Sequence, residues 1–213
     1  IFTALSAALD GFEQKDVLHY LRSALSPLNP DLCDLVENYA YVWNVNGSAW
    51  KKPWVNHPYG FSGYWTSQAK STLQRAEFGR TLAIEPLQEL HRAFYNAASL
   101  TQQVEALETF LDQIRFYKRL EKMAYDTERA GDSRAAQILI QLCDIIPNAL
   151  QQLTDVLGNT LWDGASFQRL LGMLISQYDV GTIPTVLDAV HIGPVSAMRC
   201  QSRKHLIVLG CEE

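Results

Sequence analysis

Apolar side chains recur at helical spacing along most of the chain. Residues 2–25 predict two short helices that separate at Asp10-Gly11. A third helix is expected after Asn29, which would cap it, with Pro30 at the first helical position, where a missing N–H costs nothing. From about residue 68 to 177 the pattern predicts helices throughout, so the expected fold class is mainly α, a helical bundle.

Local signals divide this long helical region. Glu85-Pro86 is expected to open one helix, and Ser99-Leu100-Thr101-Gln102 resembles a capping box before the next. Gly131-Asp132-Ser133 predicts a break, and Gly158 predicts an end. Pro147 lies between these two positions and should kink or split its helix, because proline removes a backbone donor.

Residues 48–67 fit neither a helix nor a strand. The stretch holds six aromatic residues among prolines and glycines, and no period relates them. Loops of this length inside a compact domain are usually functional or pack against another part of the protein. We therefore expect a binding loop or a surface that inserts into a neighbouring domain.

Strand-forming residues replace the helical pattern after Gly181. Residues 182–192 and 206–209 predict two or three strands, with a loop or short helix at 194–202. Strands this hydrophobic normally lie in a sheet that is covered on both faces. A small β portion near the C-terminus is therefore expected, with the remaining strands supplied from elsewhere. Together with the start at Ile1, this favours a piece excised from a longer protein.

Composition and charge are those of an ordinary globular protein. Hydrophobic residues make up 47% and charged residues 19% of the 213 residues, and no apolar run is long enough to span a bilayer. The net charge of −5 argues against an autonomous nucleic-acid binder, since such proteins usually carry a basic face. The four cysteines show no disulfide framework, which favours reduced thiols and a cytoplasmic location.

Sequence motifs for catalysis and cofactor binding are absent. The chain holds no phosphate-binding loop, no G-x-G-x-x-G, no H-E-x-x-H and no G-x-S-x-G. Cys200, His205 and Cys211 lack a recognised zinc spacing and a fourth ligand. We therefore expect no catalytic residue, no cofactor site and no metal site within this chain.

Two basic clusters are candidates for contact with DNA. In the first, Trp50 supplies a ring that can stack on a base, while Lys51 and Lys52 can pair with phosphates. The second cluster precedes an expected buried strand, where a loop can contact phosphate. Its three cations are Arg199, Arg203 and Lys204. For both clusters the alternative is solvated side chains at a packed loop or a domain edge.

Two segments resemble a known family. Leu35-Val36-Glu37-Asn38-Tyr39 and the following residues 43–50 resemble the run LENYxxxxGIRGxxW of AddB/RexB-type subunits of bacterial helicase–nucleases. Residues 183–193, Met198-Arg199 and residues 204–210 resemble the family's run IP…LDqVxIGxxxRxR…KxxFVLG. This second run stands where UvrD-like helicases carry motif V. Ala197 occupies the place of one arginine of the family's pair.

The resemblance implies a division of the chain. In UvrD-like helicases a helical 2B subdomain interrupts the second RecA-like domain. Residues 1–50 would then be a helical entry segment from the RecA-like 2A domain, and residues 51–178 a 2B-like helical insertion. Residues 179–213 would return to a truncated 2A domain with two or three strands.

The resemblance also implies a function for a parent subunit. Such subunits join a partner helicase–nuclease, process double-strand DNA ends and support recombinational repair, and ATP with magnesium is implied for the parent alone. This chain would be a DNA-guiding or domain-contacting module that is not an enzyme by itself. The acidic charge favours an alternative, a helical scaffold that docks a partner and does not touch DNA. An independent enzyme is the least favoured interpretation.

Overall fold

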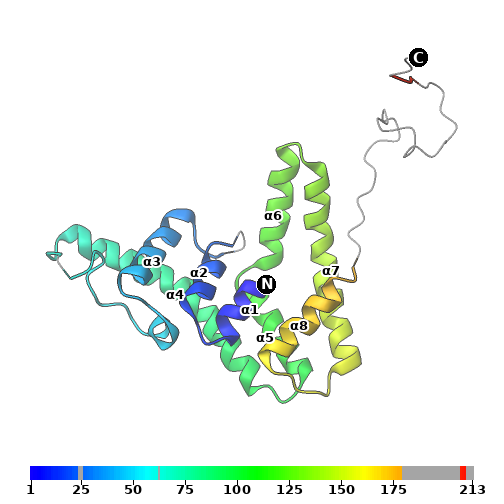
Figure 1. Cartoon of the computed structure of the whole chain (residues 1–213), viewed down its shortest axis with the longest axis horizontal. Coiled ribbons are helices and arrows are strands. Elements are labelled where there is room, and N and C mark those ends of the chain that lie inside the picture. Colours follow the sequence, from blue (N-terminus) through cyan, green and yellow to red (C-terminus); the bar gives the residue numbers. More distant parts are fainter. Residues whose placement is uncertain (24–25, 62, 179–206, 210–213) are drawn as a thin grey trace. The chain divides into compact units, whose positions relative to one another are not determined.

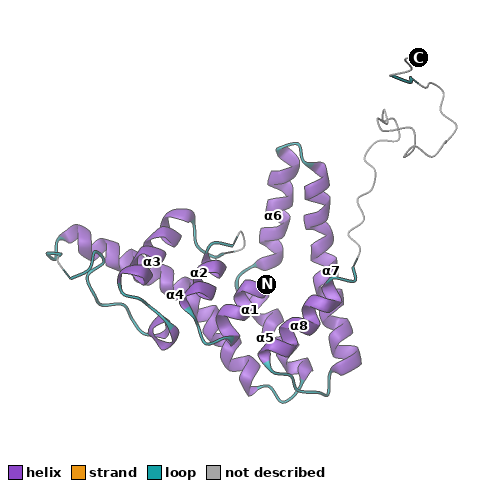
Figure 2. Ribbon diagram, viewed as in Figure 1, coloured by secondary structure: helices purple, strands orange, loops and turns teal. Residues whose placement is uncertain are grey.

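The computed structural model describes residues 1–23, 26–61, 63–178 and 207–209. This part of the chain forms helices and loops and contains no strand (Figure 1 and Figure 2). The mainly α fold class is confirmed. The helices are α1 (Phe2–Leu9), α2 (Gln14–Leu21), α3 (Pro30–Val42), the 3-10 helix η1 (Gly47–Lys51), α4 (Ser67–Asn96), α5 (Leu100–Gln113), α6 (Phe116–Arg129), α7 (Ser133–Leu157) and α8 (Gly164–Ile175).

The expected β portion falls mostly outside the described residues. This applies to the strands predicted at 182–192 and to the connection at 194–202. Residues 207–209 are the described part of the strand expected at 206–209, and they have no regular secondary structure. The small β portion is therefore not confirmed.

The chain divides into two compact units, residues 1–181 and residues 182–213. In the first unit α1 contacts α2, α4 and α8, and α3 packs on α4. The unit therefore continues across residue 50, where the resemblance implies passage from a 2A-type to a 2B-type domain. The assignment of each part to one of these domain types stays a prediction.

Short polar side chains cap five of the helices at their N-termini. Each cap accepts a hydrogen bond from the backbone N–H three residues later, which satisfies one of the free donors of the first turn. Pro30 follows its cap at the first helical position, as the sequence predicts. The capping residues are Asn29, Thr66, Ser99, Asp132 and Asp163.

The helix expected to open at Glu85-Pro86 does not begin there. Pro86 lies inside α4, which is continuous for 30 residues. A proline within a helix costs about 3 kcal/mol, because it removes a backbone hydrogen bond and crowds the preceding turn. Ile84 and Leu87 on either side of it are fully buried in the core, and their packing offsets this cost. Pro147 is likewise contained within α7 and does not split it.

One continuous core holds the first unit together. Buried side chains from all eight α-helices contribute to it. Phe94 of α4 meets Phe167 of α8 edge to face, with ring centres 5.1 Å apart. Gly79 lets α3 approach α4 closely, since a Cβ there would lie 2.7 Å from the Val36 side chain. In Figure 1, α6 and the first half of α7 form a projecting hairpin. No helix in the described part is long and apolar enough to cross a membrane.

Candidate nucleic-acid interface

Trp50 belongs to the core and not to the surface. It has no exposed area, and its ring centre lies 5.6 Å from that of Trp54. The structure therefore corrects the expected role of Trp50, because a fully buried ring has no face to offer to a base. The three cations of the second cluster lie outside the described residues, and their contact with phosphate stays a prediction: Arg199, Arg203 and Lys204.

Lys51 and Lys52 are exposed, as a contact with phosphate requires. The Lys51 ammonium lies 4.3 Å from the centre of the Phe12 ring, a cation–π contact that holds its stem against the core. Lys52 lines a shallow hollow of about 170 Å³ beside the end of α3. The structure therefore leaves both lysines accessible. Whether they touch DNA stays a prediction.

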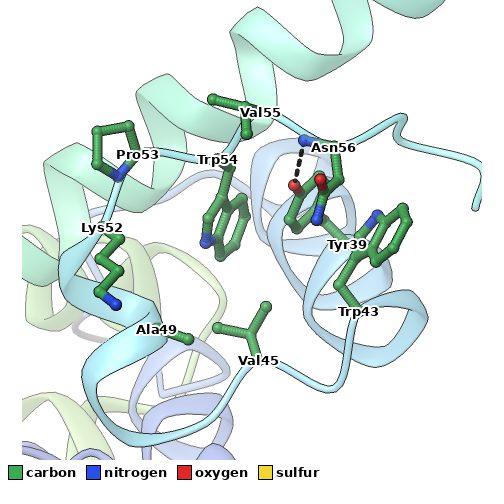
Figure 3. Close-up of a pocket in the computed structure, with 9 residues that line it drawn as sticks. All are labelled: Tyr39, Trp43, Val45, Ala49, Lys52, Pro53, Trp54, Val55 and Asn56. Carbon is green, nitrogen blue, oxygen red and sulfur yellow. Dashed lines mark hydrogen bonds between the residues drawn. The ribbon is translucent and has the colours of Figure 1, made fainter.

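The hollow is walled by aromatic side chains (Figure 3). The rings of Tyr39 and Trp54 are stacked with centres 4.2 Å apart. The Tyr39 hydroxyl accepts a hydrogen bond from the Asn56 N–H at 3.1 Å. Burial raises the pKa of Tyr39, and this hydrogen bond partly offsets the rise. Trp54 is buried, and its indole N–H is one of the few buried polar groups without a partner in the described part.

A buried ion pair from α4 fixes the backbone around this hollow. The Arg80 side chain is only 8% exposed and donates to the Trp50 carbonyl at 2.9 Å. It also donates to both carboxylate oxygens of Glu77, at 2.7 and 2.5 Å. Glu77 in turn accepts the Trp54 N–H at 2.9 Å. This pair replaces the backbone hydrogen bonds that an irregular loop cannot make within itself.

His57 organises the next part of the loop. Its Nδ1 accepts the Tyr59 N–H at 3.2 Å, so the ring proton lies on Nε2, which donates to the Tyr64 carbonyl at 3.2 Å. The rings of Tyr59 and Trp65 meet it edge-on, at 5.6 and 4.8 Å. The backbone of Gly63 passes so close that a Cβ would lie 2.0 Å from the imidazole. A side chain at this position would therefore displace the His57 ring or the loop.

Four rings of this loop face solvent. Phe61 is 94% exposed and Tyr64 is 91% exposed. Phe61 still meets the ring edge of Trp43 at 4.6 Å, and the Tyr59 hydroxyl shares a hydrogen bond with Thr72 of α4. We call these residues the exposed ring cluster: Tyr59, Phe61, Tyr64 and Trp65.

The sequence indicated this irregular aromatic loop, but Trp50, the ring that it singled out for stacking, is buried. Trp50 is buried where η1 packs on α4, and Arg80, which lies 30 residues away, binds the Trp50 carbonyl; no local pattern reveals these contacts. The available signal was the pair Gly60 and Gly63, which lies among the exposed rings and is typical of irregular backbone. The site offers exposed rings and ammonium groups, which suit a ligand with flat rings and anionic groups.

Groups of three or more His, Cys, Asp or Glu side chains that could hold a metal ion do not occur among the described residues. No protein-family model matches the chain. Curated proteins do match it.

The chain is 27% identical over 217 aligned positions to the AddB subunit of the ATP-dependent helicase/deoxyribonuclease of Clostridium botulinum (strain Hall), covering 100% of this chain and 19% of that protein. The protein of the same name from Clostridium perfringens (strain 13) is 27% identical over 86% of the chain and 16% of its own length. That of Thermoanaerobacter sp. (strain X514) is 24% identical over 96% of the chain and 18% of its own length. The chain thus spans less than a fifth of the curated relatives it matches.

Proposed function

We propose that the chain is a segment of the AddB-type subunit of a bacterial ATP-dependent helicase/deoxyribonuclease, the family that its sequence motifs resemble. The observation that carries the proposal is the similarity to these subunits, which covers 96% to 100% of the chain but only 18% to 19% of the relatives. The order of the two sequence motifs, one in α3 and one after residue 182, supports it further.

The parent subunit would act in the cytoplasm with a partner helicase–nuclease subunit. Together they would use ATP and magnesium to process the ends of broken DNA for repair by recombination. The segment itself would be a helical module that guides DNA and contacts neighbouring domains. Lys51 and Lys52 would contact phosphate from one loop, and Arg199, Arg203 and Lys204 from another.

This function is tested in the full subunit together with its partner. We expect ATP-dependent unwinding and degradation of linear duplex DNA, and a clear loss of both in the Arg199→Ala/Arg203→Ala double variant. Arg134→Ala, an exposed arginine at the start of α7, is the matched control and should leave both activities unchanged. Absence of any ATP-dependent DNA processing by the intact pair would contradict the proposal.

A second candidate function, an acidic scaffold that docks a partner subunit, is supported by an apolar groove between α7 and α8. The groove has a volume of about 210 Å³, and Val156 and Met173 on its wall are largely exposed. Exposed apolar surface of this kind marks protein interfaces. If the scaffold function holds, Val156→Asp/Met173→Asp will weaken association with the partner subunit and leave DNA binding unchanged.

A further inference from the structure

Residues 38–76 form a continuous stretch without a single aspartate or glutamate. The rest of the chain carries all 23 acidic residues against 14 lysines and arginines. The net charge is therefore +4 in this segment (4 − 0) and −9 in the rest of the chain (14 − 23), because the segment lacks acids and not because it is rich in cations. We call residues 38–76 the acid-free segment. Its four cations are all exposed: Lys51, Lys52, Lys70 and Arg75.

The exposed ring cluster belongs to this same segment, and contacts connect it to the cations. Lys52 lines the hollow that Trp43 also lines, and Trp43 meets the ring of Phe61. On the other side, Tyr59 is hydrogen-bonded to Thr72 of α4 at 3.2 Å. Arg75 lies one helical turn further along the same face of α4 as Thr72. The exposed ring cluster is thus connected to Lys52 on one side and to the exposed face of α4 that carries Arg75 on the other.

The backbone that carries the exposed ring cluster is held in place before any ligand arrives. His57 fixes the backbone on both sides of the cluster through its hydrogen bonds to Tyr59 and Tyr64. Arg80 and Glu77 fix the preceding backbone at Trp50 and Trp54. A surface that is ordered in advance loses less conformational entropy on binding. Large exposed rings on such a framework are therefore suited to stack on a ligand.

We infer that the acid-free segment is a binding surface for single-stranded DNA. The exposed ring cluster stacks on unpaired bases, and the four cations contact the phosphates. At the hollow, the exposed Lys52 ammonium is a donor for a phosphate oxygen. The choice of DNA as the nucleic acid rests on the proposed function.

The charge pattern favours a nucleic acid over a protein partner. A protein interface uses aromatic residues but has no reason to exclude carboxylates over 39 consecutive residues, whereas a surface that follows phosphates does. Ring faces favour a single strand over a duplex, because the bases of a duplex are already stacked on one another.

The test is binding of the 213-residue chain to a fluorescent oligothymidylate of about 16 nucleotides, the upper end of site sizes for small single-strand-binding folds. The logarithm of the binding constant should fall linearly with the logarithm of the salt concentration. We expect a slope between about −2 and −3, set by four phosphate contacts. A blunt duplex of equal length should bind at least about tenfold more weakly. Phe61→Ala/Tyr64→Ala should weaken single-strand binding at least about tenfold.

Matched controls come from α6. Tyr125→Ala removes a ring that is 62% exposed, and Lys118→Ala/Lys122→Ala removes two cations that lie outside the acid-free segment. Neither change should affect affinity. Lys51→Ala/Lys52→Ala should reduce the magnitude of the salt slope by about 1.4, and the α6 lysine variant should not. Thermal denaturation of each variant verifies that the unit remains folded.

Several binding results would overturn the inference. They are absence of single-strand binding at low salt, equal binding of the duplex, and unchanged affinity in the Phe61→Ala/Tyr64→Ala variant. If that variant instead destabilised only the full subunit, the cluster would be an interface with another domain, and the inference would be wrong. Each of these results leaves the proposed function intact, since that fails only if the subunit pair does not process DNA ends.

Discussion

The acid-free segment and the α6–α7 hairpin lie in one compact unit but are stabilised differently. Between residues 116 and 157 the hairpin carries five cations and six acids, and its helices close their backbone hydrogen bonds internally. The described residues of the loop at 52–66 form no helix or strand. Their backbone is held by the side chains of Tyr39, Trp43 and Glu77 from outside the loop and by His57 within it. The comparison shows that few polar contacts determine the shape of the candidate site, whereas distributed packing determines the shape of the hairpin.

The largest expected effect comes from Arg80→Ala. The change leaves the Trp50 carbonyl without this donor and Glu77 without its cation, so that Glu77 keeps only the Trp54 N–H. We expect a loss of about 3 kcal/mol in the free energy of unfolding, measured by urea denaturation. Arg92→Ala, an exposed arginine on the same helix, should cost less than about 0.5 kcal/mol. Equal losses in the two variants would show that the ion pair does not hold the loop.

Gly63→Ala should have the next largest effect. The new methyl group would overlap the His57 ring, so either the ring or the loop must move, at a cost of about 1–3 kcal/mol by thermal denaturation. Gly172→Ala is the opposite control in α8, where the Cβ meets the Phe2 ring at an ordinary 3.8 Å. That change should raise the free energy of unfolding by about 0.5–1 kcal/mol, because alanine has a higher helix propensity than glycine. A neutral Gly63→Ala would mean that the His57 contacts are dispensable.

Two buried tyrosines allow a comparison: the Tyr39 hydroxyl has a hydrogen-bond partner, and the Tyr20 hydroxyl has none among the described residues. Tyr39→Phe should lose about 1 kcal/mol, because its hydroxyl accepts the Asn56 N–H. The Tyr20 hydroxyl is buried and has no partner within the described residues, so Tyr20→Phe should be neutral or slightly stabilising. Urea denaturation of both variants measures the difference. Similar losses of unfolding free energy in both variants would contradict this difference in hydrogen bonding.

The smallest expected effect is the contribution of Tyr117, in α6 of the hairpin, to the pH dependence of stability. Burial, reinforced by Glu108 and Asp112, raises the pKa of Tyr117 to about 12, from about 10 when unfolded. The unfolded state then releases its proton first, so this contribution to stability is complete below pH 10 and is lost as the pH rises towards 12. Tyr117→Phe should unfold at a higher pH than the wild type in an alkaline titration. An unchanged midpoint would contradict the raised pKa.

The hairpin and the caps could be predicted from local sequence. Asn29-Pro30, Gly131-Asp132-Ser133 and Gly158 act through their own backbone geometry, and the helices begin and end at these positions. The prediction for Pro86 is wrong because its local cost is offset by Ile84 and Leu87, whose burial depends on distant helices.

The candidate site was only partly predictable. Its loop was evident from the unpatterned aromatics, and Lys51 and Lys52 are exposed as a binding role requires. The burial of Trp50 was not evident, since it depends on the packing of η1 against α4 and of the Trp50 ring against Trp54. Local patterns show where a loop lies. Which of its aromatic side chains are buried and which are exposed depends on contacts with residues far along the chain.

The most direct test of the DNA-binding surface is ultraviolet cross-linking of the 213-residue chain to oligothymidylate, followed by mass spectrometry of the linked peptides. We predict cross-links at Tyr59, Phe61, Tyr64 or Trp65, lost on competition with unlabelled single strand and retained on competition with blunt duplex. Cross-links confined to α6, α7 or α8, or none in the acid-free segment, would contradict the account.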